Sequence, residues 1–235
     1  MADDTIIRIE LSQFYESRAR TAIRNLQRKN MEGHFVPNRQ QALDLVMSLI
    51  PPGAVVGRGD SVTLNQLGVI EALARRGQNR VINPVQTDAE GLHLPREERR
   101  KLQREALFSD IFLTSTNALT LNGTLVSIDG AGNRVAAMMF GPKKVLVVAG
   151  GNKIVTDVEE ALHRIHNVVS PINSIRHYNK HRQAEAIARP CVKLGKCTDC
   201  FHEWRVCRYT AIIDGCQPPE QGRICVILVG EDLGI

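Results

Sequence analysis

Four cysteines near the end of the 235-residue chain have a spacing that suits a metal centre. Cys191, Cys197, Cys200 and Cys207 form a C-x5-C-x2-C-x6-C pattern. A C-x2-C turn directs two sulfurs to the same side, and a thiolate on either flank can complete a four-sulfur set. Zinc ribbons usually contain two C-x2-C pairs, whereas this segment contains one. The spacing therefore favours a 4Fe–4S cluster, with a zinc ion as the alternative.

The residues around these cysteines also suit a metal centre. Four thiolates leave a charge of about −2 on either Zn²⁺ or an oxidised 4Fe–4S core, which basic neighbours would offset. These neighbours are Lys193, Lys196, Arg205 and Arg208. His202 lies inside the segment and could replace one thiolate as a ligand. Because cytosolic thiols stay reduced, a metal centre is favoured over disulfide bonds or catalytic thiols, the two remaining interpretations.

Other cysteines and histidines have simpler expected roles. Cys225 lies in an apolar run and is expected in the core, whereas Cys216 follows a turn and is a candidate substitute ligand whose role stays open. Four histidines fall at helical spacing without a metal motif such as H-E-x-x-H. We expect them to be exposed or to support other residues: His163, His166, His177 and His181.

Three loops combine glycine with small polar or charged residues directly after a predicted strand. They cover residues 57–61 (GRGDS), 129–134 (DGAGNR) and 150–153 (GGNK). Ligands of open α/β sheets bind at the carboxyl ends of the strands, where glycines let backbone N–H groups approach an anion. None of the loops is a Walker loop or a G-x-G-x-x-G fingerprint, and each alone could be an ordinary turn. Together they predict a shared anion pocket formed by Gly57, Gly59, Ser61, Gly130, Gly132, Asn133, Arg134, Gly150, Gly151 and Asn152.

The same loops supply three candidates for proton transfer. Asp60, Asp129 and Lys153 are the ionisable groups that would face such a pocket. Helix capping, turn formation and surface solvation are the alternative roles for these side chains. The sequence alone leaves both possibilities open.

Short apolar strands that alternate with helices must position these loops. The strands are expected at residues 54–57, 80–83, 110–114, 145–149 and 224–229, and the helices at residues 14–29, 40–50, 65–76, 95–108, 156–168 and 172–188. Asn122-Gly123 predicts a β-hairpin with a type I′ turn between residues 118–121 and 124–128. This alternation predicts an α/β fold with a mostly parallel sheet covered by helices on both faces. Residues 1–189 would form the α/β domain, and residues 190–235, with the cysteine segment and a final strand, would complete it.

Composition limits the partners of the chain. The net charge of +5 fits a small anionic metabolite, while an aromatic content of 4% argues against stacking on single-stranded nucleic acid. The densest basic run, residues 96–105 (REERRKLQRE), mixes both signs and is typical of a solvated helix face. No signal peptide or membrane span is recognised. We therefore expect a cytoplasmic protein without nucleic-acid or membrane partners; the oligomeric state stays open, a homo-oligomer included.

Several motifs in order along the chain resemble the LUD (lactate utilisation) domain family. They are residues 59–64 (GDSVTL), 114–120 (TSTNALT), 123–126 (GTLV), 129–136 (DGAGNRVA) and 141–144 (GPKK). The cysteine segment and the ending at residues 229–234 (VGEDLG) resemble a branch common in anaerobic bacteria. The resemblance implies a NagB/RpiA/CoA-transferase-like layered fold, and it adds Thr114, Thr116 and Asn117 to the expected ligand-binding residues. It also implies a link to lactate oxidation, in which some members accompany iron–sulfur or oxidoreductase partner proteins.

Three functions are compatible with these features. The first is an iron–sulfur redox component that binds a small organic anion such as lactate. The second is a non-redox enzyme of the isomerase or CoA-transferase type with a structural metal, and the third is a module that senses a metabolite. The family resemblance supplies no established catalytic residue, and a shared fold does not fix the chemistry.

Overall fold

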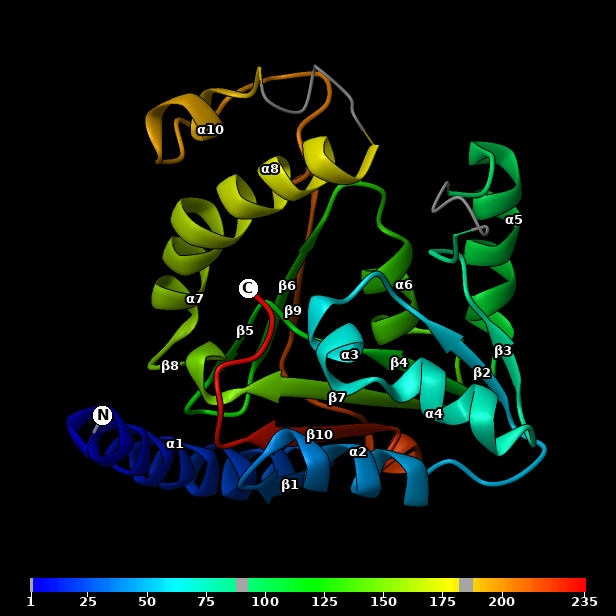
Figure 1. Ribbon diagram of the computed structural model, residues 1–235, viewed down its shortest axis with the longest axis vertical. Helices are drawn as coiled ribbons and strands as arrows, with labels where there is room; N and C mark the ends of the chain where they lie inside the picture. Colours follow the sequence, from blue (N-terminus) through cyan, green and yellow to red (C-terminus); the bar gives the residue numbers. More distant parts are fainter. Residues whose placement is uncertain (1, 88–92, 182–187) are drawn as a thin grey trace.

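A six-stranded parallel sheet forms the centre of the computed structural model, which describes residues 2–87, 93–181 and 188–235 (Figure 1). Every neighbouring pair in its order, β1-β10-β7-β4-β2-β3, is parallel. The strands are β1 (Glu32–Val36), β2 (Val55–Arg58), β3 (Arg80–Ile82), β4 (Ile111–Thr114), β7 (Lys144–Gly150) and β10 (Ile224–Val229). The predicted parallel α/β architecture is confirmed.

The central strands are apolar over most of their length because helices cover both faces of a parallel sheet. Every residue of β4 and β10 is buried, as expected for strands that are covered on both faces. The final strand, β10, pairs with β1 on one side and β7 on the other, so the last residues of the chain complete the middle of the sheet. Strand β1 escaped prediction because its residues, EGHFV, are only half-buried at the sheet edge.

Helices cover both faces of this sheet. On one face pack α1 (Ala2–Arg28), α6 (Asn133–Met139) and the short turn after α5 (Arg96–Glu105). On the other face pack α2 (Arg39–Ser48), α3 (Val62–Leu67) and α4 (Val69–Arg76). Helix α1 runs along the bottom of the molecule in Figure 1 and extends past the sheet at its amino-terminal end. It begins well before the predicted residue 14.

A smaller four-stranded sheet stands beside the main one, in the order β8-β5-β6-β9. Its strands are β5 (Ala118–Thr120), β6 (Leu125–Asp129), β8 (Ile154–Val155) and β9 (Tyr209–Ile213). The predicted hairpin of β5 and β6 is confirmed, but the type I′ turn is wrong. Thr120 and Thr124 close a three-residue loop in which Gly123, at φ +78°, is the residue with positive φ. This is the bulged alternative to the two-residue turn.

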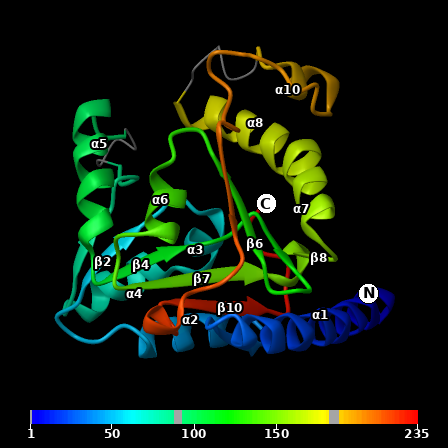
Figure 2. The same ribbon diagram turned by 180° about the vertical axis from the view of Figure 1, so that it is seen from behind.

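A nearly continuous helical segment covers the small sheet and carries the cysteine segment above it. It consists of α7 (Val158–Arg164), a π-helical turn (Ile165–Val169) and α8 (Ser170–His181). The short helix α10 (Pro190–Leu194) packs on α8, and the chain then descends to β9, as Figure 2 shows from behind. Of the helix predicted at residues 172–188, residues 182–187 lie outside the described residues. No helix in the described part of the chain combines the length and apolar character needed to cross a membrane.

Candidate functional site

A cavity of about 520 Å³ lies at the carboxyl ends of the central strands. The loops after β2 and β4 and the turn after β7 form its floor. Helix α8 and the cysteine segment form one wall, and the start of α5 lies on the opposite side (Figure 1). The strand-end position is the one that parallel α/β sheets use for ligands.

Lys153 lies at the floor of this cavity and is only 3% exposed. Its Nζ donates to Ser115 Oγ at 2.9 Å, to Thr63 Oγ1 at 3.1 Å and to the Thr116 carbonyl oxygen at 3.3 Å. Burial, together with the neighbouring Arg164 and Arg134, lowers the pKa of Lys153 to about 7. An amine with such a pKa can bind an anion when protonated and accept a proton when neutral.

Asp60 lies at the cavity edge in an ion pair with two cations of α8. Arg176 donates to both carboxylate oxygens, at 2.6 and 3.2 Å, and Lys180 Nζ donates at 3.0 Å. Burial alone would raise the pKa of Asp60, but the two cations hold it well below its ordinary value. Asp60 is therefore a poor base at neutral pH, and its evident role is to anchor α8 over the β2 loop.

Asp129 holds the start of helix α6. Its Oδ2 accepts the backbone N–H groups of Arg134 and Val135, both at 3.0 Å, and its Oδ1 accepts Arg134 Nε at 3.0 Å. Arg134 also donates to Asn117 Oδ1 at 2.8 Å and to the Ser115 carbonyl oxygen at 2.7 Å. This network ties the β4 and β6 loops together beneath the cavity. Of the three proton-transfer candidates, Lys153 alone lacks a carboxylate or cation partner among the described residues.

The structure brings together many of the predicted pocket residues, including most of those in the first two glycine loops. Those that line the cavity are Asp60, Ser61, Thr116, Asn117, Asp129, Gly130, Asn133, Arg134 and Lys153. Those that lie outside its lining are Gly57, Gly59, Thr114, Gly132, Gly150, Gly151 and Asn152. Several of the glycines outside the lining allow close packing between elements instead. A Cβ at Gly57, for example, would lie 2.8 Å from Ser109 Oγ.

The third glycine loop is covered by other parts of the chain. A Cβ at Gly151 would lie 2.1 Å from the ring of Tyr15 on α1, and one at Gly150 would lie 2.5 Å from the Glu231 carbonyl oxygen. Asn152 Oδ1 accepts the backbone N–H of Leu233 at 3.1 Å. The loop therefore packs against α1 and the last residues, while only Lys153 of this loop reaches the cavity.

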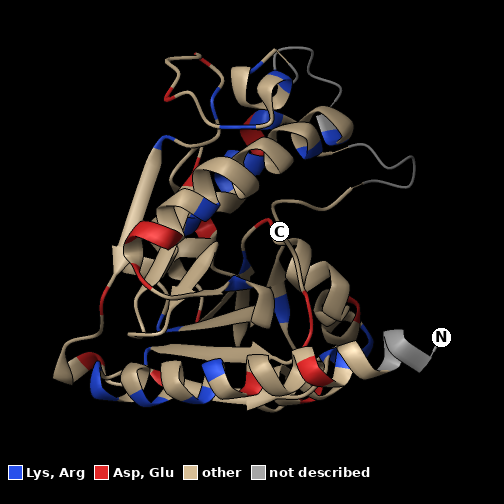
Figure 3. Cartoon of the chain, turned by 90° about the vertical axis from the view of Figure 1, so that its left-hand side faces the viewer, with Lys and Arg blue, Asp and Glu red and all other residues tan. Residues whose placement is uncertain are grey.

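The walls of the cavity are strongly basic. The described lining residues include ten Lys or Arg side chains and three carboxylates, of which Asp60 and Asp129 are already ion-paired. The cations are Arg96, Arg99, Arg100, Arg134, Lys153, Arg176, Lys180, Arg189, Arg205 and Arg208. Figure 3 shows Lys and Arg along α8 and in the segment above it. Such a field favours an anionic ligand over a neutral one.

Many of these cations lie outside the residues that the sequence singled out. Arg96, Arg99 and Arg100 belong to the run that was expected to be a solvated helix face, yet one side of α5 lines the cavity. Their i, i+3, i+4 spacing is a usable signal for a shared face. His177 also lines the cavity, and burial lowers its pKa to about 4, so its ring is neutral at pH 7.

Part of the cysteine segment forms a wall of the cavity, although the four cysteines themselves lie outside its lining. Trp204, Arg205 and Val206, between the third and fourth cysteines, all line it. Arg189, which is 4% exposed, donates from Nε to the Trp204 carbonyl oxygen at 2.7 Å. Its Nη1 is buried without a hydrogen-bond partner among the described residues. Burial lowers the pKa of Arg189, while the nearby Cys191, Cys207 and Cys200 raise it.

The four thiols influence one another. Burial raises the pKa of both Cys191 and Cys207, and the neighbouring cysteines raise it further. Cys197 Sγ lies 3.4 Å from Nδ1 of His166, which the π-helical turn carries, and it accepts the backbone N–H of Asp199 at 3.3 Å. π-Helical turns are frequent at functional sites.

The other predicted features of the segment also have defined places. Lys193 and Lys196 are exposed, and Arg205 Nη1 donates to the Cys200 carbonyl oxygen at 2.8 Å. Cys216 lies away from the cluster, because its backbone binds Lys29 and Asn30 at the end of α1. Cys225 is buried in β10, as expected.

The parallel sheet and its basic strand-end cavity define an α/β domain with a candidate ligand site. A sequence model described as the LUD domain matches residues 19–229, and the chain belongs to this family. Among solved structures, the chain is similar to a DUF162 family protein from Deinococcus radiodurans, determined at 1.70 Å resolution. The two are 14% identical, the alignment covers 94% of this chain and 97% of that one, and the TM-score is 0.44. No curated protein matches the chain.

Proposed function

We propose that the chain is an iron–sulfur redox component that binds a small organic anion, of the lactate type, in the strand-end cavity. In this proposal Cys191, Cys197, Cys200 and Cys207 hold a 4Fe–4S cluster. The anion binds over Lys153, and the cluster carries an electron to or from the reacting system. Membership of the LUD family supports a role in lactate utilisation.

One observation carries the proposal: residues 203–206, between the third and fourth cysteines, form a wall of the cavity. Arg189 and Trp204 line the cavity and are joined by a hydrogen bond of 2.7 Å, while Arg189 also lies among three of the thiols. A redox group placed here would lie next to a bound anion. A purely structural metal would need no such position.

The environment of the thiols fits an anionic cluster. Arg189 keeps a buried N–H group without a partner among the described residues, and such a group is costly unless an acceptor lies opposite it. The sulfides and thiolates of a cluster are acceptors of this kind.

The spacing of the cysteines along the chain also favours iron–sulfur over zinc. Zinc ribbons usually contain two C-x2-C pairs, and the segment from Cys191 to Cys207 contains one.

The chemistry requires a partner. Oxidation of a 2-hydroxy acid to a 2-oxo acid releases two electrons and two protons, and a 4Fe–4S cluster passes one electron at a time. The proposal therefore includes an oxidoreductase or iron–sulfur partner protein in the cytoplasm that takes or supplies the electrons. The basic wall serves to hold the carboxylate during this exchange.

The test is to measure the reduction potential of the cluster in anaerobically purified protein, with and without lactate. EPR monitors the reduction of the cluster. A bound anion stabilises the less negative, oxidised cluster, so lactate should lower the potential. A shift of about 59 mV corresponds to a tenfold difference in anion affinity between the two redox states. Lys153→Met should abolish the shift, whereas Lys101→Met on the exposed side of α5 should retain it. A protein without a reducible cluster would overturn the proposal.

A second candidate is supported by Lys153. An amine with a pKa of about 7 at the floor of a cavity suits acid–base catalysis in a non-redox isomerase or CoA-transferase-like enzyme, with zinc at the cysteines. Turnover assays with sugar phosphates and acyl-CoAs test it directly. Turnover that disappears in Lys153→Met and survives removal of the metal would favour this function over the redox one. Binding without turnover would instead indicate a ligand-sensing module.

A further inference from the structure

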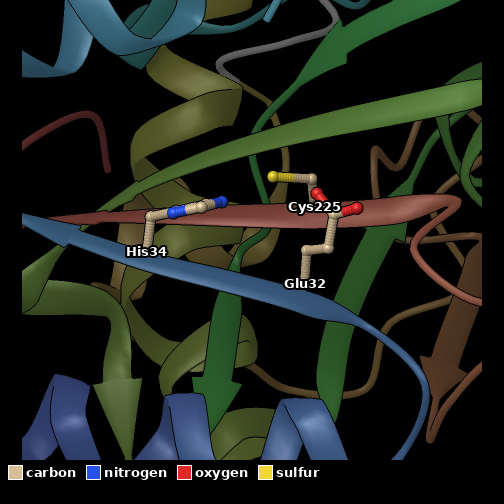
Figure 4. A group of neighbouring side chains, drawn as sticks. All are labelled: Glu32, His34 and Cys225. Atoms are coloured by element: carbon tan, nitrogen blue, oxygen red, sulfur yellow. The ribbon is translucent and has the colours of Figure 1, made fainter.

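Three side chains at the opposite end of the main sheet bring a carboxylate, an imidazole and a thiol together. Glu32 and His34 are two residues apart on the edge strand β1, so they point to the same face. Cys225 on β10 is the direct partner of Glu32 in the parallel register. Figure 4 shows the three side chains on one side of the two strands. Their ligand atoms all lie within 4.8 Å of one another.

We propose that Glu32, His34 and Cys225 form a binding site for a single thiophilic divalent cation such as Zn²⁺. Zinc accepts sulfur, nitrogen and oxygen ligands together, in tetrahedral geometry with bonds of about 2.0–2.3 Å. Three protein ligands would leave the fourth position to water. The site lies at the amino-terminal ends of β1 and β10, so it is separate from the strand-end cavity and from the cysteine segment.

The backbone beside the site lies close to the carboxylate. A Cβ at Gly222, at φ +76°, would come within 2.5 Å of Glu32 Oε1, so a side chain at this position would crowd Glu32. Cys225 is fully buried, whereas Glu32 and His34 are half-buried, which gives the site one protected ligand and two that solvent reaches.

Lys144 is the charged group that already contacts this cluster. Its Nζ donates to both oxygens of Glu32, at 3.1 and 3.0 Å. A carboxylate has about four lone-pair positions, so these two hydrogen bonds leave positions for a metal. The ammonium nevertheless repels a cation, and removing it should tighten metal binding.

The thiol must lose its proton when the cation binds. Burial and the neighbouring Glu32 together raise the pKa of Cys225 to about 12, while Lys144 acts in the opposite direction. Formation of the metal–sulfur bond thus releases one proton to solvent and leaves a thiolate, without any oxidation or reduction. The dication then faces one carboxylate and one thiolate, which balance its charge.

The experiment is a Co²⁺ titration of the intact protein, followed by sulfur-to-cobalt charge-transfer absorption and competed with Zn²⁺. All variants keep the cysteine segment, so cobalt that binds there contributes equally to every titration and is subtracted. Compared with the unsubstituted protein, Cys225→Ser should lose one equivalent and its charge-transfer band. His34→Gln should bind that equivalent at least tenfold more weakly, and Lys144→Met should bind it several-fold more tightly. Cys216→Ser, a half-buried cysteine outside the site, should bind as the unsubstituted protein does.

Two results would overturn the proposal. Identical stoichiometry and spectra in the unsubstituted protein and His34→Gln would place all the cobalt elsewhere. A Lys144→Met variant that binds no more tightly would show that the carboxylate is no ligand. Circular dichroism of each variant checks that it is folded, and His34→Gln, which alters a half-buried side chain, keeps the test valid if Cys225→Ser does not fold.

Discussion

The lowered pKa of Lys153 predicts how the stability of the protein depends on pH. The amine titrates near 10.5 in the unfolded chain and near 7 in the folded protein. Between these values the unfolded state binds one more proton than the folded state, so the free energy of unfolding rises with pH. Below pH 7 both states are protonated, and the folded protein bears the full cost of the buried charge.

The magnitude follows from the two pKa values. One pKa unit corresponds to about 1.4 kcal/mol, so the contribution of Lys153 should become more favourable by about 2 to 3 kcal/mol between pH 6 and pH 9. Lys153→Met removes this contribution. Urea denaturation of both proteins across that range gives the difference in their free energies of unfolding, from which all the shared titrating groups cancel.

As pH increases, the free energy of unfolding of the unsubstituted protein should rise relative to that of Lys153→Met. Lys101→Met, which removes a positive charge from the exposed surface of α5, controls for the change in net charge. A difference that stays flat within about 0.5 kcal/mol would refute the reasoning, because it would mean that the cavity floor does not destabilise the ammonium.

Three other substitutions test separate parts of the account. Arg189→Gln should lower the iron retained per chain after anaerobic purification, measured by metal analysis, while the exposed Lys193→Gln should not. Gly151→Ala places a methyl group against the ring of Tyr15 and should lower the free energy of unfolding by about 1–3 kcal/mol in urea denaturation; unchanged stability would mean that α1 does not pack there. Asp60→Asn releases two α8 cations and should tighten phosphate binding several-fold by calorimetry, and weaker binding would count against an anion site.

The sequence predicted the parallel strands because they are long apolar runs. Strands β4, β7 and β10 are buried on both faces, so no alternation with polar residues obscures them. Strands β1 and β9 lie at sheet edges and carry exposed or half-buried residues, which makes their pattern weak. The turn type failed for a different reason: an Asn-Gly pair fits either a two-residue turn or a three-residue loop, and the pairing of Thr120 with Thr124 decides between them.

The candidate site was only partly predictable. The glycine loops mark the carboxyl ends of strands, so Ser61, Arg134 and Lys153 could be placed near one another from the chain alone. The α8 and cysteine-segment walls depend on contacts between residues far apart, such as Asp60 with Arg176. Propensity and spacing describe local structure, and they carry little information about such pairs.

The third glycine loop shows that composition can also predict a binding loop where the structure has a packing contact. It has the composition of an anion loop, but α1 and the final residues cover most of it. A glycine needed for close packing and a glycine needed for ligand approach look the same in a sequence. Only the packed structure separates the two.

The central claim is that the four cysteines hold an iron–sulfur cluster beside the cavity. The most direct measurement is iron, zinc and acid-labile sulfide analysis, with EPR before and after dithionite, on protein purified anaerobically. We predict about four iron and four sulfide per chain and an EPR signal that develops on reduction. A colourless protein with stoichiometric zinc at the cysteines and no sulfide would contradict the account.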